Sequence, residues 1–276
     1  MKNNRFVKLI QNTLNVFSSN EMDVYSGYAT LYILMALIPL LMLVISIANM
    51  MPFFSADDFS AFLMKIIPDL SQVQSMFDGI IRNLNSQSSG LVASISALTT
   101  LWSASNGVSS IQAGLEHMEG VHRSSLKGKP MALVFTLVFI LLIPALLIFS
   151  LLRDPVISAV SALLTYLHLE KSAVLFENVM NYSGIFTVVA AALVILLTYT
   201  YLPYGKRTLK SQLPGAVFTT LAAGIFTAAF GFFMGTFWKA SAVYGSLAAI
   251  FLATMWLKFI ITILFYGAAF NKAKEN

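Results

Sequence analysis

The chain has 276 residues, of which 58% are hydrophobic and 11% are charged, and its mean hydropathy is +0.78. A water-soluble globular domain carries roughly 25% charged residues, so this composition excludes that class and indicates a polytopic membrane protein. The net charge of +5 would suggest a nucleic-acid partner in a soluble chain, but in a membrane chain it directs attention to where the basic residues lie. The absence of cysteine excludes disulfides, thiol catalysis and cysteine-ligated metals.

The first predicted element is a short amphipathic helix over residues 5–18. Its apolar residues follow helical spacing, and basic residues lie near its start: Phe6, Ile10, Leu14 and Phe17, with Lys2, Arg5 and Lys8. Two placements fit this pattern equally well. The helix lies on an anionic membrane surface, or it packs on the helix bundle from the cytoplasm. Because apolar and charged residues are mixed here, we expect no cleavable signal peptide.

Six stretches are predicted to cross a hydrocarbon core of roughly 30 Å as α-helices. They are residues 28–50, 90–115, 131–152, 183–201, 213–237 and 245–269. Pro39 and Pro144 fall inside two of them, where neighbouring helices can re-satisfy the freed backbone groups. We therefore expect an all-α integral membrane protein with six transmembrane helices, forming one domain over residues 1–276.

The connection over residues 52–89 is predicted to form two further amphipathic helices. Apolar residues keep helical spacing on both sides of Pro68, but neither half is apolar enough to span a membrane. These helices would cover the bundle on its extracytoplasmic side. They act either as a structural cover or as a moving lid over a cavity.

Residues 90–115 carry small and polar side chains along one side of the predicted helix. The stripe consists of Ser96, Thr99, Ser103, Asn106, Ser110 and Gly114. Such a stripe belongs inside a bundle, where it either packs closely against neighbouring backbones or lines a wet path. In the second case, Thr99, Ser103 and Asn106 contact a substrate.

Small residues recur at every fourth position along residues 213–237. The ladder consists of Gly215, Thr219, Ala223, Thr227, Gly231 and Gly235, and a second one runs beside it at Ala216, Thr220, Gly224 and Ala228. This small-xxx-small pattern allows another helix to approach closely over its full length. We expect this helix to be central and the ladder to serve helix packing.

Lys258 is the first candidate functional residue, because it lies near the middle of the sixth apolar stretch. A cation facing lipid there costs about 2.5–3.5 kcal/mol on insertion scales, so we expect it to face a partner or water inside the bundle. It could pair with the phosphate or carboxylate of a bound molecule. The alternatives are that the side chain snorkels or contacts a backbone carbonyl.

The distribution of basic residues predicts the topology. Eleven of the 17 lysines and arginines lie in the N-terminal segment, in residues 116–130, in residues 202–212 and in the C-terminal tail. Five lie in the other connections. Both termini are therefore expected in the cytoplasm, in a multi-pass protein of the bacterial cytoplasmic membrane whose basic loops contact anionic lipids.

Several short pieces occur in a fixed order along the chain: Ala29, Tyr32 to Pro39, Leu101-Trp-Ser-Ala-Ser-Asn-Gly107, Pro214-Gly-Ala216, Tyr244-Gly-Ser246, Trp256, and Gly267-Ala268. In these pieces the chain resembles the YihY/BrkB family of bacterial inner-membrane proteins, long labelled ribonuclease BN. The resemblance implies a six-span helical bundle and a cell-envelope context, without a settled activity. The family often has an acid after the last Gly-Ala pair and a tyrosine two residues after the tryptophan. Ala269 and Lys258 stand there in this chain, so no role of that acid is carried over.

A ribonuclease requires clustered metal ligands or a general acid and base pair. On the predicted cytoplasmic side only Glu116, Glu119 and His122 have a suggestive spacing, and Gly120 weakens the helix there. A second such motif, a nucleophile motif, a phosphate-binding glycine loop and an aromatic RNA platform are all missing. We therefore expect no enzymatic activity, cofactor, metal or nucleic-acid partner.

Two functions of other classes remain. The chain transports or translocates an anionic lipid or envelope precursor, using Lys258 and the polar stripe inside a membrane cavity. Alternatively, it is a non-catalytic assembly or scaffold protein of the envelope, whose small-residue ladder contacts a second copy or another membrane protein.

Overall fold

The computed structural model describes residues 2–50, 89–121, 125–167, 183–205, 207–237 and 241–275, with a few residues between 169 and 176. These described residues form α-helices and turns without a strand, as the sequence predicts. The two helices predicted within residues 52–89 lie outside the described residues.

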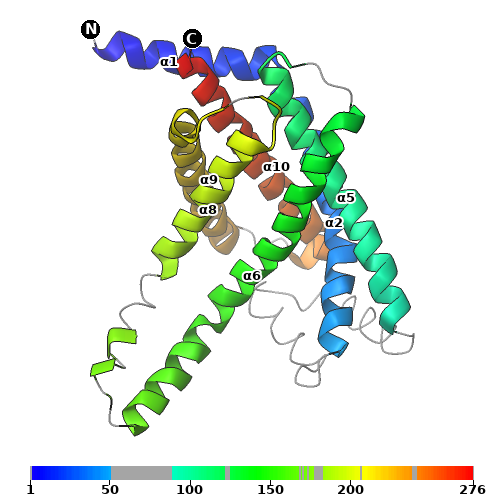
Figure 1. The fold of residues 1–276 in the computed structure, drawn as a ribbon, viewed down its shortest axis with the longest axis vertical. Coiled ribbons are helices and arrows are strands. Elements are labelled where there is room, and N and C mark those ends of the chain that lie inside the picture. Colours follow the sequence, from blue (N-terminus) through cyan, green and yellow to red (C-terminus); the bar gives the residue numbers. More distant parts are fainter. Residues whose placement is uncertain are drawn as a thin grey trace.

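Both ends of the chain lie at one end of the molecule, which we call the terminal end. The helices are α1 (Lys2–Ser19), α2 (Met22–Met50), α5 (Ser89–Met118), α6 (Ser125–Tyr166), α8 (Ser183–Tyr201), α9 (Leu209–Phe237) and α10 (Ser241–Glu275). In Figure 1, α1 lies across the terminal end at the top, and the turns after α5 and α8 lie at the same end. The long helices therefore extend from the terminal end toward the opposite end of the molecule.

Each predicted stretch lies within a described helix, although α2 begins six residues earlier than predicted and α10 ends six residues later, and the largest difference is at α6. The sequence predicts a span that ends at residue 152, followed by a long connection, whereas α6 continues to Tyr166 and has 42 residues. The residues that follow Pro155 are small or apolar and contain no glycine, so they continue a helix without difficulty. At about 1.5 Å per residue, α6 is about 63 Å long, roughly twice the thickness of a hydrocarbon core.

Two described segments are long and apolar enough to cross a membrane, Leu209–Met234 in α9 and Ile250–Lys274 in α10. Pro130–Leu142 and Thr187–Tyr201 are shorter apolar segments. Much of this apolar surface is not covered by protein: Ile225 of α9, for example, is 71% exposed. Such a surface is stable in lipid, not in water. Membrane location follows from these features, and the number of crossings stays a prediction.

The buried core formed by the described side chains lies toward the terminal end and involves most of the described helices. Its residues include Phe17, Met22, Ala29, Val108, Ile111, Leu115, Met118, Ala132, Tyr199, Leu202, Ala216, Ile261, Phe265, Ala268 and Ala269. Helix α2 packs along α5, and α10 packs on α1, α2 and α9. A Cβ atom at Gly114 of α5 would lie 2.6 Å from Phe265 of α10, so glycine is what allows this approach.

Candidate functional site

The turn between α8 and α9, residues 202–208, is the centre of the candidate site. Pro203 follows the end of α8 at Tyr201, and a proline disfavours helical geometry in the residue before it. Gly205 has φ = +134°, a backbone conformation that L side chains rarely adopt. Pro203 therefore favours the end of α8, and Gly205 allows the chain to turn sharply before α9 begins.

A buried carboxylate on α5 holds this turn in place. Glu116 is 7% exposed, and its Oε1 accepts a hydrogen bond of 3.0 Å from the backbone N–H of Tyr204. The same oxygen accepts a second bond of 3.0 Å from Nε2 of Gln112, one helical turn earlier. Hydrogen bonds to a carboxylate are stronger than those between neutral groups. Glu116 thus fixes the α8–α9 turn on the side of α5.

Glu119 joins three elements through ion pairs just after the end of α5. Its Oε2 lies 2.8 Å from Nζ of Lys272 on α10, and its Oε1 lies 3.6 Å from a guanidinium nitrogen of Arg207 in the turn. Gly120 follows with φ = +71°, and its N–H donates to the carbonyl of His117. Gly120 therefore acts as a helix C-cap that directs Glu119 toward both cations.

Thr208 caps the first turn of α9 beside these charges. Its Oγ1 accepts a hydrogen bond of 3.3 Å from the N–H of Ser211, which is the usual role of a threonine at this position. Arg207 also donates to the carbonyl of Tyr199, at 3.1 Å. The start of α9 is thus tied to both α8 and the preceding turn.

Two buried polar side chains hold α10 against α8 and α9 behind the turn. Oδ1 of Asn271 accepts the N–H of Gly215 at 2.7 Å, and Nδ2 of Asn271 donates to Gln212. The hydroxyl of Tyr199 donates to the carbonyl of Leu264 and lies 2.7 Å from Oγ1 of Thr219. Because the Tyr199 proton is used in the first bond, the Thr219 hydroxyl is the donor in the second.

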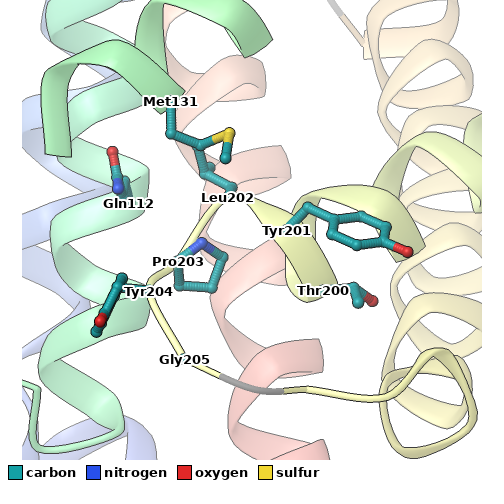
Figure 2. A pocket seen from close by; sticks show the side chains of 8 residues that line it. All are labelled: Gln112, Met131, Thr200, Tyr201, Leu202, Pro203, Tyr204 and Gly205. Atoms are coloured by element: carbon teal, nitrogen blue, oxygen red, sulfur yellow. The ribbon is translucent and has the colours of Figure 1, made fainter.

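Two adjoining cavities lie beside the turn. The larger, about 520 Å³, is lined by Gln112, Met131, Thr200, Tyr201, Leu202, Pro203, Tyr204 and Gly205, and is shown in Figure 2. The smaller, about 360 Å³, is lined by Glu119, Val121, Tyr204, Gly205, Arg207, Thr208, Ser211 and Gln212. The first is mainly aromatic and aliphatic, whereas the second contains charged and hydroxyl groups. Tyr204 and Gly205 belong to both.

Lys258 contacts the start of α2 and lines neither of these cavities. Its Nζ lies 2.8 Å from Oδ1 of Asp23, 2.7 Å from the Asp23 carbonyl oxygen and 2.7 Å from Oγ of Ser26. The side chain of Lys258 is 31% exposed and that of Asp23 is 74% exposed. These contacts match the alternative in which the Lys258 side chain extends to a backbone carbonyl. They join α10 to α2 near the terminal end.

The three polar residues predicted to contact a substrate on α5 lie in different surroundings. Ser103 is buried, Asn106 is half-buried, and Thr99 is exposed with its hydroxyl bonded to the carbonyl of Ile95. None of the three lines either cavity described above. At Gly107, one turn beyond Ser103, a Cβ atom would lie 2.7 Å from Ile33 of α2. Helices α2 and α5 therefore pack closely at Gly107, and the substrate contact of the three polar residues stays a prediction.

The small-residue ladder of α9 packs closely on α10 only near its start. Added Cβ atoms at Gly215 and Gly267 would overlap the opposite helix, and Thr219 is 2% exposed. Ala223 is half-buried, Thr227 is exposed, and a Cβ at Gly231 would meet nothing within 4 Å. Gly235 lies in α9, but its surroundings are outside the described residues. Along the described part, the close approach therefore does not extend over the whole helix.

Sequence reasoning missed the residues that build this site. Glu116 and Glu119 were considered only as metal ligands, together with His122, which lies outside the described residues. Arg207 is expected from the sequence only as one of the basic residues of a cytoplasmic loop, and no sequence pattern predicts a role for Asn271. A usable signal existed: Glu116 and Asn271 directly follow Leu115 and Phe270 at the ends of predicted membrane-spanning stretches, where a buried polar side chain needs a partner.

The fold and the site together define an integral membrane protein. Apolar helices with exposed lipid-compatible surfaces carry a cluster of polar contacts at one end. The chain matches the family model described as "Virulence factor BrkB" over residues 13–276, and it belongs to this family.

Two relatives are similar to the chain. The "Putative ribonuclease-like protein YfkH" of Bacillus subtilis (strain 168) is 26% identical over 275 residues, covering 92% of this chain and 90% of the relative. A "UPF0761 membrane protein" of Chromobacterium violaceum is 30% identical over 105 residues, covering 38% of this chain and 25% of the relative. No solved structure matches the chain significantly.

Proposed function

We propose that this chain transports or translocates an anionic lipid or envelope precursor, and that it holds this amphiphile in the two cavities beside the α8–α9 turn. The observation that supports this is that one cavity is mainly apolar and the adjoining one contains charged and hydroxyl groups. Tyr204 and Gly205 line both cavities. Their volumes of about 520 and 360 Å³ are in the range of ligand pockets. An amphiphile needs such a pair of neighbouring polar and apolar spaces.

The charges favour an anionic head group in the smaller cavity. Glu119 and Arg207 line this cavity, and Lys272, which does not line it, pairs with Glu119, so the cluster of these three residues has a net charge of +1. The hydroxyl of Thr208, which also lines this cavity, adds a hydrogen-bond donor, whereas the Ser211 hydroxyl donates to the Thr208 carbonyl. Met131 and Leu202, among others, provide apolar contacts for an acyl chain in the larger cavity.

A matched pair of variants at Ser211 tests the proposed site. Ser211→Glu places a negative charge in the smaller cavity, whereas Ser211→Gln adds a neutral side chain of the same size. Ser211 is three residues after the capping Thr208, a position where glutamate favours a helix start, so we expect both variants to fold. The readout is mass spectrometry of the lipids retained by gently purified protein at matched yield.

We expect the wild type and Ser211→Gln to retain one class of anionic amphiphile and Ser211→Glu to lose it. Equal retention by Ser211→Glu, or no selective retention by the wild type, would overturn the proposed site. A retained lipid then directs the choice of a translocation assay in vesicles, in which the same pair of variants is compared.

The topology proposed with this function has six crossings and both termini in the cytoplasm. The support is that α1, the two chain ends and the turns after α5 and α8 all lie at the terminal end (Figure 1), where Arg207 and Lys272 also lie. Basic residues favour the cytoplasmic side. The cavities would then open at the cytoplasmic leaflet, where an envelope precursor made inside the cell arrives.

We also propose that this chain is not a ribonuclease. The support comes from Glu116 and Glu119, the two acids with a suggestive spacing: Glu116 accepts two structural hydrogen bonds and Glu119 pairs with two cations. Among the described residues, no group of three or more acids, histidines or cysteines could hold a metal ion. Neither carboxylate is thus presented to an RNA phosphate.

The alternative function is assembly or scaffolding through helix contacts. It is favoured by the far part of the α9 ladder, where Cβ atoms at Gly224 and Gly231 would meet nothing within 4 Å. A second copy or another membrane protein could pack there. Crosslinking at Gly224 in native membranes would distinguish this function, because a defined crosslinked partner is expected from a scaffold and none from a protein that acts alone.

A further inference from the structure

Helix α1 is fixed at the level where the transmembrane helices begin. Only Asn20 and Glu21 separate α1 from α2, and Asn20 caps α1 by donating to the carbonyl of Val16 at 2.7 Å. Phe17 of α1 stacks on Tyr266 of α10, with 4.0 Å between the ring centroids. In Figure 1, α1 lies across the ends of the other helices. It is therefore held at the boundary between the bundle and its surroundings.

The apolar residues of α1 are divided between two directions. One set, around Thr13 and Phe17, is buried against α10. A second set, which we call the apolar flank, consists of Val7, Ile10 and Leu14, and these residues are 46%, 45% and 49% exposed. At about 100° per residue, the apolar flank covers an arc of about 60°. Packing on α10 thus accounts for only part of the apolar surface of α1.

The polar residues of α1 occupy a separate arc. Lys8, Gln11 and Asn15 are all exposed, and they fall within about 60° of one another, centred about 100° from the apolar flank. Such a division into a buried face, an apolar flank and a polar face suits a helix lying in the plane of a membrane surface.

We propose that the apolar flank of α1 docks into the headgroup region of the lipid leaflet at the terminal end, with anionic lipids beside the basic residues of this helix. The charge of α1 favours this partner: the helix contains Lys2, Arg5 and Lys8 and no acidic residue. Anionic lipids attract such segments electrostatically, while the flank contributes apolar burial. The partner is thus the bilayer that already surrounds α9 and α10.

The position of α1 links this lipid contact to the candidate site. Tyr266, which stacks on Phe17, lies on the same helix as Asn271 and Lys272. Asn271 accepts a hydrogen bond from Gly215 near the start of α9, and Lys272 forms an ion pair with Glu119 beside the α8–α9 turn. A leaflet that holds α1 therefore also supports the end of α10 that carries the site.

The chain contains no cysteine, so single cysteines can be introduced directly and labelled with a nitroxide. We compare Leu14→Cys, in the apolar flank, with Asn15→Cys on the polar face, since both positions are exposed. The full chain is placed in vesicles containing phosphatidylglycerol and phosphatidylethanolamine. Collision rates with oxygen, which concentrates in lipid, and with a water-soluble nickel chelate report the depth of each label.

We expect the Leu14 label to have a several-fold higher oxygen-to-nickel ratio than the Asn15 label. In phosphatidylcholine vesicles this ratio should fall at Leu14, and an unchanged ratio would overturn the role of anionic lipid. Equal nickel access at both positions would place the flank in water and overturn the docking. Shielding from both reagents, with spin–spin broadening between labels, would instead identify a second copy as the partner. Ile10→Cys provides the same test if Leu14→Cys does not fold.

Discussion

The two ends of α9 carry the same repeating pattern but have different neighbours. At Gly215, an added Cβ would overlap the carbonyl oxygen of Gly267 on α10. Four turns later, at Gly231, an added Cβ would meet none of the described residues within 4 Å. Between them, at Thr227, the contact with α10 is made by the long side chain of Trp256, whose Nε1 lies 3.3 Å from Oγ1 of Thr227. The two helices therefore diverge away from the terminal end.

This comparison separates what a small-residue pattern permits from what it determines. Small residues remove the steric barrier to close helix approach, and this holds along the whole ladder. The partner's path is set elsewhere, here by Tyr199 and Asn271, which fasten α10 to α8 and α9 close to the turn. A pattern of this kind thus predicts the face of contact more reliably than its extent.

The largest expected effect comes from adding bulk at the closed end of this pair. Gly215→Leu would force a side chain into Asn271 and the backbone of Gly267. Overpacking costs about 1–3 kcal/mol, and here it also breaks the bonds that Asn271 makes, so we expect a larger loss of stability. The measurement is the yield of monodisperse protein in mild detergent, together with its thermal unfolding midpoint.

The matched control is Gly231→Leu on the same helix. Since the space at Gly231 is open and leucine favours helices over glycine by up to about 1 kcal/mol, we expect an unchanged or slightly higher midpoint. If both substitutions were equally damaging, the far part of α9 would have a partner of its own. That result would favour the scaffold function.

The sequence predicted the helices well because their signals are local. Long apolar stretches and their end residues determine where a membrane helix begins and ends, and the bounds of α8, Ser183–Tyr201, match the prediction. The error at α6 has a physical reason. Pro155 falls after the predicted end at residue 152, but proline within a membrane helix is tolerated and the residues after it continue the helix.

The candidate site was poorly predictable because it depends on contacts between distant residues. Glu116 and Tyr204 are 88 positions apart, and Asn271 and Gly215 are 56 positions apart. Neither pairing leaves a periodic pattern in one sequence. Lys258 stood out because of its position in an apolar stretch, but its partner Asp23 lies 235 positions away. The charge was recognisable from the sequence, and its partner was not.

An intermediate effect is expected at Glu116 of α5, which holds the α8–α9 turn. Glu116→Ala leaves the N–H of Tyr204 and the amide of Gln112 without their acceptor, at a cost of about 1–3 kcal/mol. Glu116→Gln keeps an acceptor oxygen at the same place, so we expect it to remain close to wild type. Thermal unfolding of both variants, with lipid retention as a second readout, measures the difference.

The pair also separates structure from catalysis. A carboxylate that bound a metal or acted as a base would lose its role in Glu116→Gln as fully as in Glu116→Ala. If Glu116→Gln abolished a function that the parent has while leaving its unfolding midpoint unchanged, the hydrogen-bonding role assigned to Glu116 would be insufficient.

The smallest effect is expected at Lys258, despite its place in the middle of an apolar helix. Its partner Asp23 is 74% exposed, and ion pairs of this kind contribute about 0–1 kcal/mol. After Lys258→Met, Asp23 stays accessible and Ser26 keeps its bond to the Asp23 carbonyl. We expect the unfolding midpoint to fall by at most about 4 °C, with a similar shift for Asp23→Asn and less in high salt. A collapse of folding in Lys258→Met alone would mean that the cation has a buried partner besides Asp23 and Ser26. The helices away from the terminal end would then be packed more closely than the open space around the far end of α9 indicates.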